Sequence, residues 1–149
     1  MANELLIALV QASNAHAKAC ISAFSELNLS PGQPKVLSCL NFKEGYLQKE
    51  LAALCRVEPA TMTVLLNTME KNGLIRKEIS HVSGGKRAYR IFLTENGREV
   101  AQKVDGIVDG VEKKSFQGFS AKEREDALRA LEKIAANLSP KDTVSQTQD

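Results

Sequence analysis

A short basic stretch, SGGKRAYRIF at residues 83–92, contains the residue types that point most clearly to a chemistry. Residues 70–94 carry six basic and two acidic residues, a net charge of +4, whereas the whole chain of 149 residues has a net charge of +2. A local excess of lysine and arginine attracts polyanions such as nucleic acids. The sequence therefore predicts an electrostatic binding surface around this stretch.

Small polar residues form a second candidate site in PATMTVLLNTMEKNG, residues 59–73. Helical periodicity predicts an apolar side that begins with Ala60 and Met62 and continues with Leu65, Leu66 and Met69, and it leaves a polar outer side. A helix fits the major groove of DNA, where threonine can donate, accept or contact a thymine methyl and asparagine can pair with adenine. The candidate DNA-contacting residues are Thr61, Thr63 and Asn67. Alternatively, these are solvated helix positions, the first of them helping to cap the helix.

Sequence signatures of enzymes are absent from the chain. It contains no GxSxG, phosphate-binding loop, HExxH or dinucleotide-binding motif. The two histidines, His16 and His81, are far apart and form no ligand cluster with a nearby cysteine. Neighbouring carboxylates such as Glu123, Glu125 and Asp126 are typical of a solvated helix face. We therefore expect no enzymatic activity, no bound metal and no cofactor.

The cysteines and the apolar runs indicate a cellular compartment. Cys20, Cys39 and Cys55 are odd in number and contain no CxxC pair, so we expect buried thiols that behave as small hydrophobic residues. A thiol-based redox sensor acting through Cys20 is an alternative. The apolar run at residues 5–10 is much shorter than the roughly 20 residues of a membrane span. These features predict a cytoplasmic protein that has no membrane partner.

Hydrophobic periodicity and turn residues predict a mainly α-helical (α+β) chain with one β-hairpin. The expected helices cover residues 5–28, 31–42, 48–55, 59–73, 95–116 and 121–138, and the expected strands cover residues 74–80 and 89–93. The third and fourth helices are joined by a tight turn, and this arrangement predicts a helix-turn-helix. Gly84 and Gly85 supply the tip of the hairpin, which must pack against these helices because an isolated hairpin is marginally stable.

Capping residues define several helix ends. Ser30 is a candidate N-cap, with Pro31 at the first helical position and Gln33 able to reach back to the cap. Gly73 is expected in a left-handed conformation after the fourth helix. Ser120 and Glu123 form a capping box before the last helix.

The first helix has a wider apolar side than its own core requires. Its apolar residues recur at spacings of three, four or seven and therefore share one face. Leu5 and Leu9 widen that face near the N-terminal end. This width predicts a partner surface. Gly106 and Gly110 lie inside the fifth helix, where we expect a bend or a close helix contact.

The stretches QKELAALCRVEPATMTVLLNTMEKNGLIRKE and KRAYRIFLTENGRE resemble the MarR family of bacterial winged-helix regulators. With the flanking helices the resemblance covers roughly residues 5–138. It implies a homodimer that binds a pseudo-palindromic operator in double-stranded DNA, usually as a repressor. In this scheme residues 1–149 are a single MarR-like domain, in which 31–93 form the winged helix-turn-helix lobe. Residues 1–28 and 95–138 are dimerisation helices, and residues 139–149 are a flexible tail.

The resemblance also implies roles for residues outside the fourth helix. Arg87 matches the arginine with which the family's wing enters the minor groove, and Lys86 lies beside it. A narrow minor groove has an enhanced negative potential, which favours an inserted guanidinium. Gln48 and Lys49 begin the third helix, where its N-terminal dipole favours phosphates. Each of these residues could instead be an ordinary surface residue.

This chain departs from the family pattern at the wing and on the fourth helix. Gly85 stands where the family usually has an aspartate that pairs with the wing arginine. Arg87 should therefore be mobile before binding, with stronger salt dependence and weaker sequence discrimination than an aspartate-bearing wing would give. Val64 and Thr68 occupy positions where the family often has basic residues, so specificity should depend on methyl contacts and on Asn67.

Family members often bind small aromatic acids between the dimerisation and DNA-binding lobes. A ligand of this kind would shift the population between two dimer geometries, but no residue of this sequence identifies the ligand or its site. A winged-helix module that binds another protein and not DNA is a further alternative, supported by the weakly basic fourth helix.

Overall fold

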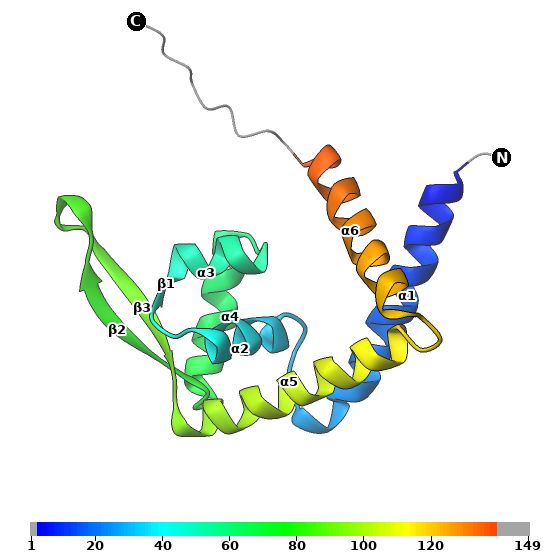
Figure 1. Ribbon diagram of the computed structural model, residues 1–149. Coiled ribbons are helices and arrows are strands. Elements are labelled where there is room, and N and C mark those ends of the chain that lie inside the picture. The colour runs from blue at the N-terminus through cyan, green and yellow to red at the C-terminus, as the bar shows by residue number, and fades with distance from the viewer. Residues whose placement is uncertain (1–2, 140–149) are drawn as a thin grey trace, which may run out of the picture. The chain divides into compact units, whose positions relative to one another are not determined.

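The computed structural model describes residues 3–139, and the chain divides into two compact units, Met1–Glu112 and Lys113–Asp149. The first unit begins with the long helix α1 and continues into a cluster of shorter helices and a β-hairpin (Figure 1). The elements are α1 (Glu4–Phe24), a 3-10 turn (Ser25–Leu27), α2 (Gln33–Phe42), β1 (Tyr46–Leu47), α3 (Gln48–Cys55), α4 (Pro59–Lys71), β2 (Ile75–His81), β3 (Arg87–Leu93), α5 (Glu95–Ser115) and α6 (Ala121–Leu138). The predicted helices and both predicted strands are confirmed, with shifts at their ends. The predicted tail, apart from Ser139, lies outside the described residues.

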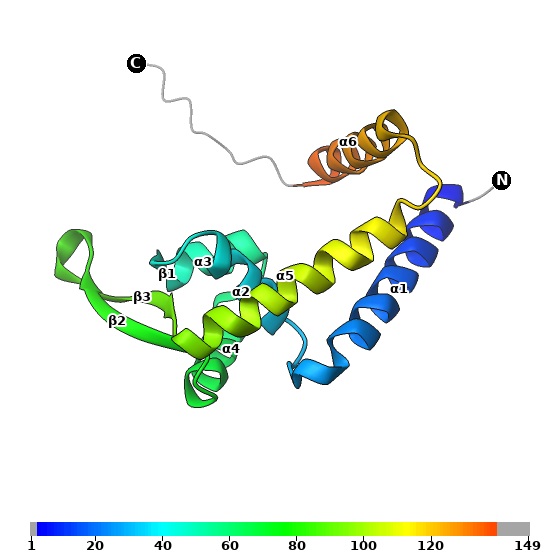
Figure 2. The same ribbon diagram turned by 60° about the horizontal axis from the view of Figure 1, so that its bottom comes forward.

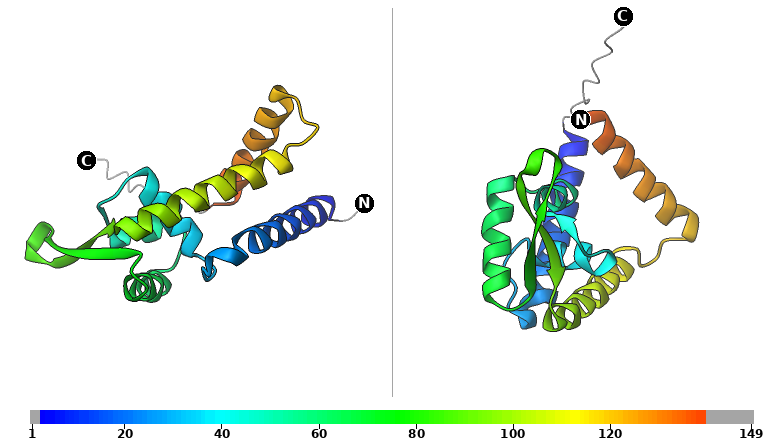
Figure 3. Two further views of the ribbon diagram at one scale, coloured as in Figure 1. Left: turned by 90° about the horizontal axis from the view of Figure 1, so that it is seen from below. Right: turned by 90° about the vertical axis from the view of Figure 1, so that its left-hand side faces the viewer.

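The sheet is antiparallel, with the strand order β1-β3-β2. In the hairpin, Ile75 lies opposite Leu93 and His81 opposite Arg87. The paired strands extend past helices α2, α3 and α4 (Figures 1 and 2), and α4 contacts β2 alongside them (Figure 3). The hairpin thus forms a wing that projects beside the helix-turn-helix.

The strand β1 was not predicted from the sequence. It has two residues, which are too few to show an alternating pattern, and Tyr46 pairs with Ile91 on β3. Two further bonds hold this segment in place: the amide of Gly45 donates to the Ile91 carbonyl at 2.8 Å, and the Arg90 guanidinium donates to the Gly45 carbonyl at 2.9 Å. Arg90 therefore ties β3 to the connection between α2 and α3.

The hydrophobic core lies among α2, α3, α4, the sheet and the first half of α5. Its most deeply buried side chains have 0–1% of their surface exposed. They are Val36, Leu37, Leu40, Leu51, Met62, Leu66, Met69, Ile75, Ile91, Leu93 and Val104. Ala60, expected on the apolar side of α4, is exposed, because it lies one turn before Val64 on the side opposite the core.

Helix α2 begins two residues later than its capping residues suggested. Gly32 adopts φ +93°, a left-handed conformation that L-residues rarely adopt, and the helix starts at Gln33. The Gln33 side chain nevertheless accepts a bond from the Ser30 amide at 3.3 Å. At the start of α6, Ser120 and Glu123 form the predicted capping box, with bonds of 3.1 and 3.2 Å. Gly73, at φ +73°, ends α4 as predicted.

The wing is fastened to α5 at one tight joint. The Thr94 amide donates to the Leu74 carbonyl at 3.1 Å, and the Thr94 hydroxyl accepts a bond from the Gly97 amide at 2.9 Å. The same hydroxyl donates to the Gly73 carbonyl at 2.6 Å. Gly97 is buried so closely against Leu74, the residue before β2, that an added Cβ would lie 1.9 Å from the Leu74 carbonyl oxygen. The joint thus fixes the direction in which α5 leaves the sheet.

Polar contacts join α5 to the helices as well. Glu44 accepts a bond from the Leu93 amide at 2.7 Å and pairs with Arg98 at 3.2 Å. Asp105 accepts bonds from Ser38 at 2.7 Å and Asn41 at 2.5 Å, both on α2. These bonds link α5 with α2 and with the segment that precedes β1.

Within residues 3–139, Phe24 at the end of α1 packs against the core, but most of the apolar side of this helix is exposed. It contains no buried residue, and its exposed hydrophobic side chains are Leu5, Leu6, Ile7, Val10 and Ile21. In the second unit, α6 likewise exposes Leu128, Leu131 and Leu138. On α5, a Cβ added at Gly106 or Gly110 would meet open space, so no close helix contact within the described chain requires these glycines.

Two of the three cysteines lie together. Cys55 is 1% exposed, and its sulfur is 3.6 Å from that of Cys39. Burial, reinforced by the neighbouring Cys39 thiol, raises the pKa of Cys55 to about 12. The Cys55 thiol is therefore protonated at neutral pH, which makes it a poor nucleophile. Cys20 lies separately on α1, half-buried and 3.8 Å from a ring nitrogen of His16.

Candidate nucleic-acid interface

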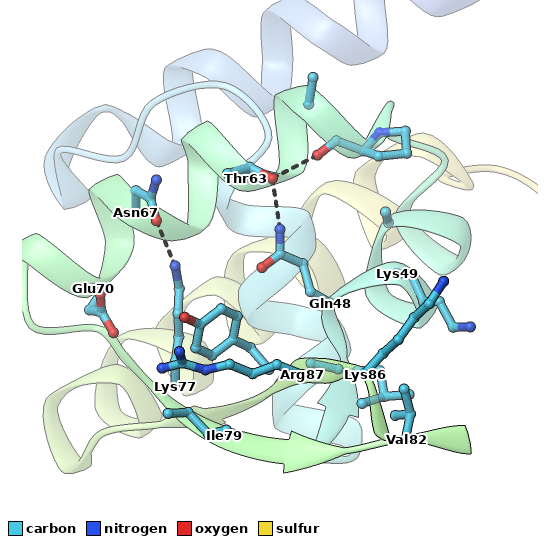
Figure 4. A pocket seen from close by; sticks show the side chains of 16 residues that line it. Gln48, Lys49, Thr63, Asn67, Glu70, Lys77, Ile79, Val82, Lys86 and Arg87 are labelled. Atoms are coloured by element: carbon cyan, nitrogen blue, oxygen red, sulfur yellow. Dashed lines mark hydrogen bonds between the residues drawn. The ribbon is translucent and has the colours of Figure 1, made fainter. Parts of the chain in front are cut away.

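A shallow groove lies between the wing and the helices α3 and α4, and we call it the interface groove (Figure 4). It collects side chains from three elements that are far apart in the sequence. Its lining residues include Gln48 and Lys49 of α3, Ala60, Thr63, Asn67 and Glu70 of α4, and Lys77, Ile79, Val82, Lys86, Arg87 and Tyr89 of the wing. Of the seven residues predicted from the sequence to contact DNA, six line this groove. Thr61 is exposed on α4 but does not line it.

The start of α3 is bonded to the exposed side of α4. The Gln48 amide donates to the Thr63 hydroxyl at 2.7 Å, and that hydroxyl donates to the Pro59 carbonyl at 3.1 Å. Glu50 accepts a bond from the Leu47 amide at 3.0 Å, so it caps α3 although residue 47 has no polar side chain. The two helices therefore hold Thr63 in a fixed position at the bottom of the groove.

Lys77 is a groove residue that sequence reasoning missed. Its ammonium donates to the side-chain oxygen of Asn67 at 2.5 Å and lies 5.6 Å from the centre of the Tyr89 ring. Because lysine can only donate, the Asn67 oxygen must face it and the amide nitrogen remains available. Strand alternation could have identified Lys77, since it places Lys77 and Ile79 on one face of β2 and Arg76 on the other.

The tip of the wing is a tight loop with two glycines in left-handed conformations. The Val82 amide bonds to the Lys86 carbonyl, and the Gly85 amide bonds to the Val82 carbonyl, each at 3.0 Å. Gly84 has φ +84° and Gly85 has φ +71°, which agrees with their predicted place in the turn. This geometry starts β3 at Arg87, next to the tip.

Positive charge dominates the interface groove. Lys49, Lys77, Lys86 and Arg87 line it together with a single carboxylate, that of Glu70. Lys86 and Arg87 are exposed, and neither side chain forms a hydrogen bond or ion pair with any residue between 3 and 139. Arg76, on the opposite face of the wing, is paired with Glu78 and stacks on Phe92 at 4.6 Å. The groove thus presents cations that are available for an anionic partner.

Residues 3–139 contain neither a cluster of metal ligands nor a membrane-spanning helix. Nowhere in this range do three or more histidine, cysteine, aspartate or glutamate side chains come together as metal ligands. No helix in the same range is long and apolar enough to span a membrane.

The chain has a helix-turn-helix followed by a β-hairpin wing, and the exposed side of its second helix faces the interface groove. This arrangement defines the winged helix-turn-helix class of transcriptional regulators. The MarR-family sequence model matches residues 29–84, which run from just before α2 to the tip of the wing. The winged helix-turn-helix lobe of this chain is thus similar to that of the MarR family of transcriptional regulators.

Individual proteins show the same similarity. The chain is 29% identical to the transcriptional regulator HosA of Escherichia coli over 107 residues, which are 72% of this chain and 78% of HosA. It is also 29% identical to the transcriptional regulator PA3341, whose crystal structure superposes with a TM-score of 0.77 over 90% of this chain and 97% of that one. A MarR-family regulator from Silicibacter pomeroyi, 24% identical, shares the fold with a TM-score of 0.76 over 91% and 90% of the two chains.

Proposed function

We propose that this protein is a homodimeric repressor that binds a pseudo-palindromic operator in double-stranded DNA and is released by a small-molecule ligand. The observation that carries the proposal is the interface groove, where unpaired cations of the wing face the exposed side of α4. Residues 31–93 form the DNA-binding lobe in this proposal, and residues 1–28 and 95–138 form the dimerisation helices. The protein acts by binding and not as an enzyme.

The proposed docking places α4 in the major groove. Thr61, Thr63 and Asn67 then face base edges, while Gln48 and Lys49 at the start of α3 lie near backbone phosphates. The N-terminus of α3 adds unpaired amides and the positive end of its dipole. Arg87 at the wing tip enters the adjacent minor groove, with Lys86 beside it.

Dimer formation is supported by the apolar residues that the chain leaves exposed. Leu5, Leu6, Ile7 and Val10 are 47–59% exposed on α1, and a cluster of this kind on a folded protein is typical of an interaction surface. A two-fold dimer presents two copies of α4 to half-sites about 10 base pairs apart, which explains why the expected operator is pseudo-palindromic. The effector acts by favouring a dimer geometry with a different spacing of the two helices.

Selection of bound sequences from random double-stranded DNA tests the proposal directly. With the full-length protein, we expect enrichment of two inverted half-sites whose centres lie about 10 base pairs apart. Binding of the selected duplex should weaken steeply with salt, because several lysine and arginine contacts release counterions. If no sequence is enriched and the basic groove captures no duplex at low salt, the DNA-binding function is wrong and the protein-binding alternative gains support.

The glycine at position 85 provides a more specific prediction about the wing. We expect Gly85→Asp to reduce the slope of log affinity against log salt by about 1 for each bound wing, since the new carboxylate offsets one cation near the phosphates. Discrimination between the operator and random DNA should rise, because the carboxylate restrains Arg87. Electrophoretic mobility shifts at several salt concentrations measure both quantities.

Gly85→Asn is the matched control for this change. Asparagine and aspartate tolerate the observed φ of +71° better than other non-glycine residues, and a Cβ added at this position has no other atom within 4 Å. The asparagine variant should therefore carry the same backbone strain but keep the wild-type salt slope. Identical slopes for glycine, asparagine and aspartate would refute a role for the missing carboxylate.

A further inference from the structure

The centre of the exposed side of α4 is an apolar residue, Val64, which is 66% exposed. At 100° per residue, the buried residues Met62 and Leu66 lie about 160° around the helix from Val64. Val64 therefore points directly away from the core. Its neighbours along the same stripe are Ala60, one turn before it, and Asn67, one turn after it.

The threonine hydroxyls of α4 are largely turned back toward the protein. Thr63 donates its hydroxyl proton to the Pro59 carbonyl at 3.1 Å and accepts from Gln48 at 2.7 Å. Thr68 donates its hydroxyl proton to the Val64 carbonyl at 3.1 Å. The middle of the outer face thus offers methyl groups to a partner, and the hydroxyl protons beside them are already committed.

We propose that Val64 reads the 5-methyl group of a thymine in each operator half-site. This inference rests on the proposed function, since it requires α4 to enter the major groove. Among the four bases only thymine displays an apolar group on its major-groove edge. Any other base would place a hydrogen-bond donor or acceptor against Val64, whose side chain has no polar atom that could bond to it.

The positive charge of the interface groove also favours DNA as the partner. Lys49, Lys86 and Arg87 line the groove together with Ala60 and Asn67, the neighbours of Val64 on α4, and this positive charge suits a polyanion and would disfavour an apolar protein surface. These charges supply affinity that is independent of sequence. Val64 adds the preference for a particular base, so its loss should change specificity more than overall binding.

The test uses the full-length protein and an operator duplex obtained by selection from random DNA. Each thymine of a half-site is replaced in turn by deoxyuridine, which removes the methyl group and keeps the pairing edge. We expect one position per half-site at which uracil weakens binding about fourfold, the value of one buried methyl-sized group, and about 15-fold when both half-sites are changed. Val64→Ala should bind the thymine and uracil duplexes with equal affinity.

Thr68→Ala is the control variant, because it truncates a neighbouring exposed side chain of α4, about 40° around the helix from Val64, and leaves Val64 itself in place. It should keep the uracil effect at the Val64 position. If the wild-type protein tolerates uracil at every position, or if Val64→Ala remains as sensitive as the wild type, the inference is wrong while specific DNA binding stands. If selection yields no operator, the proposed function fails and the inference fails with it.

Discussion

Gly97→Ala is expected to destabilise the protein by about 3 kcal/mol or more, or to prevent folding altogether. The new Cβ would lie 1.9 Å from the carbonyl oxygen of Leu74 and 3.3 Å from a methyl of Leu93. The Leu74 carbonyl cannot move away easily, since it accepts the Thr94 amide that holds β3 against β2 at this point. Relief of the clash would therefore break the joint between the wing and α5.

The matched control is Gly106→Ala in the same helix. An added Cβ there meets open space, and alanine favours a helix interior by about 1 kcal/mol relative to glycine. The two substitutions should consequently shift the urea midpoint in opposite directions, with Gly106→Ala stabilising the protein. Equal effects of the two variants would show that the contact between Gly97 and Leu74 does not limit the packing.

Arg87→Ala is expected to weaken operator binding by about 1–3 kcal/mol for each bound wing, which is about 5- to 150-fold in affinity. The proposed contact in the minor groove uses a guanidinium that forms no ion pair within residues 3–139, so binding need not break an internal bond first. The salt slope should also fall by about 1 per wing. Stability should change little, because Arg87 is exposed. Mobility shifts with the selected operator and urea unfolding measure these effects.

Arg76→Ala removes the same charge from the same hairpin and serves as the comparison. Its side chain lies on the other face of β2, paired with Glu78 and stacked on Phe92. We expect it to change operator affinity by less than about threefold, because salt screens a charge that lies far from the DNA. If both variants weaken binding equally, the wing acts only through its total charge, and an inserted Arg87 is the wrong description.

Local patterns in the sequence were sufficient for most of the secondary structure. The spacing of Met62, Leu66 and Met69 predicted the buried side of α4, and the glycine pair predicted the tip of the wing. The capping box at Ser120 predicted the start of α6. Each of these features depends on residues a few positions apart, where backbone geometry alone decides which side chains share a face.

The sequence by itself thus determined the helices, the hairpin and the resemblance to winged-helix regulators, together with six of the residues that line the interface groove. Only the tertiary structure decided which of them are held in place. The bonds from Gln48 to Thr63 and from Lys77 to Asn67, the strand β1, and the contact of Gly97 with Leu74 all join residues that are 10 or more positions apart or lie on different elements. Such contacts have no period along the chain, because they arise when separate elements pack around a shared core. Tertiary packing therefore decided that Thr63 and Asn67 are anchored by neighbouring elements.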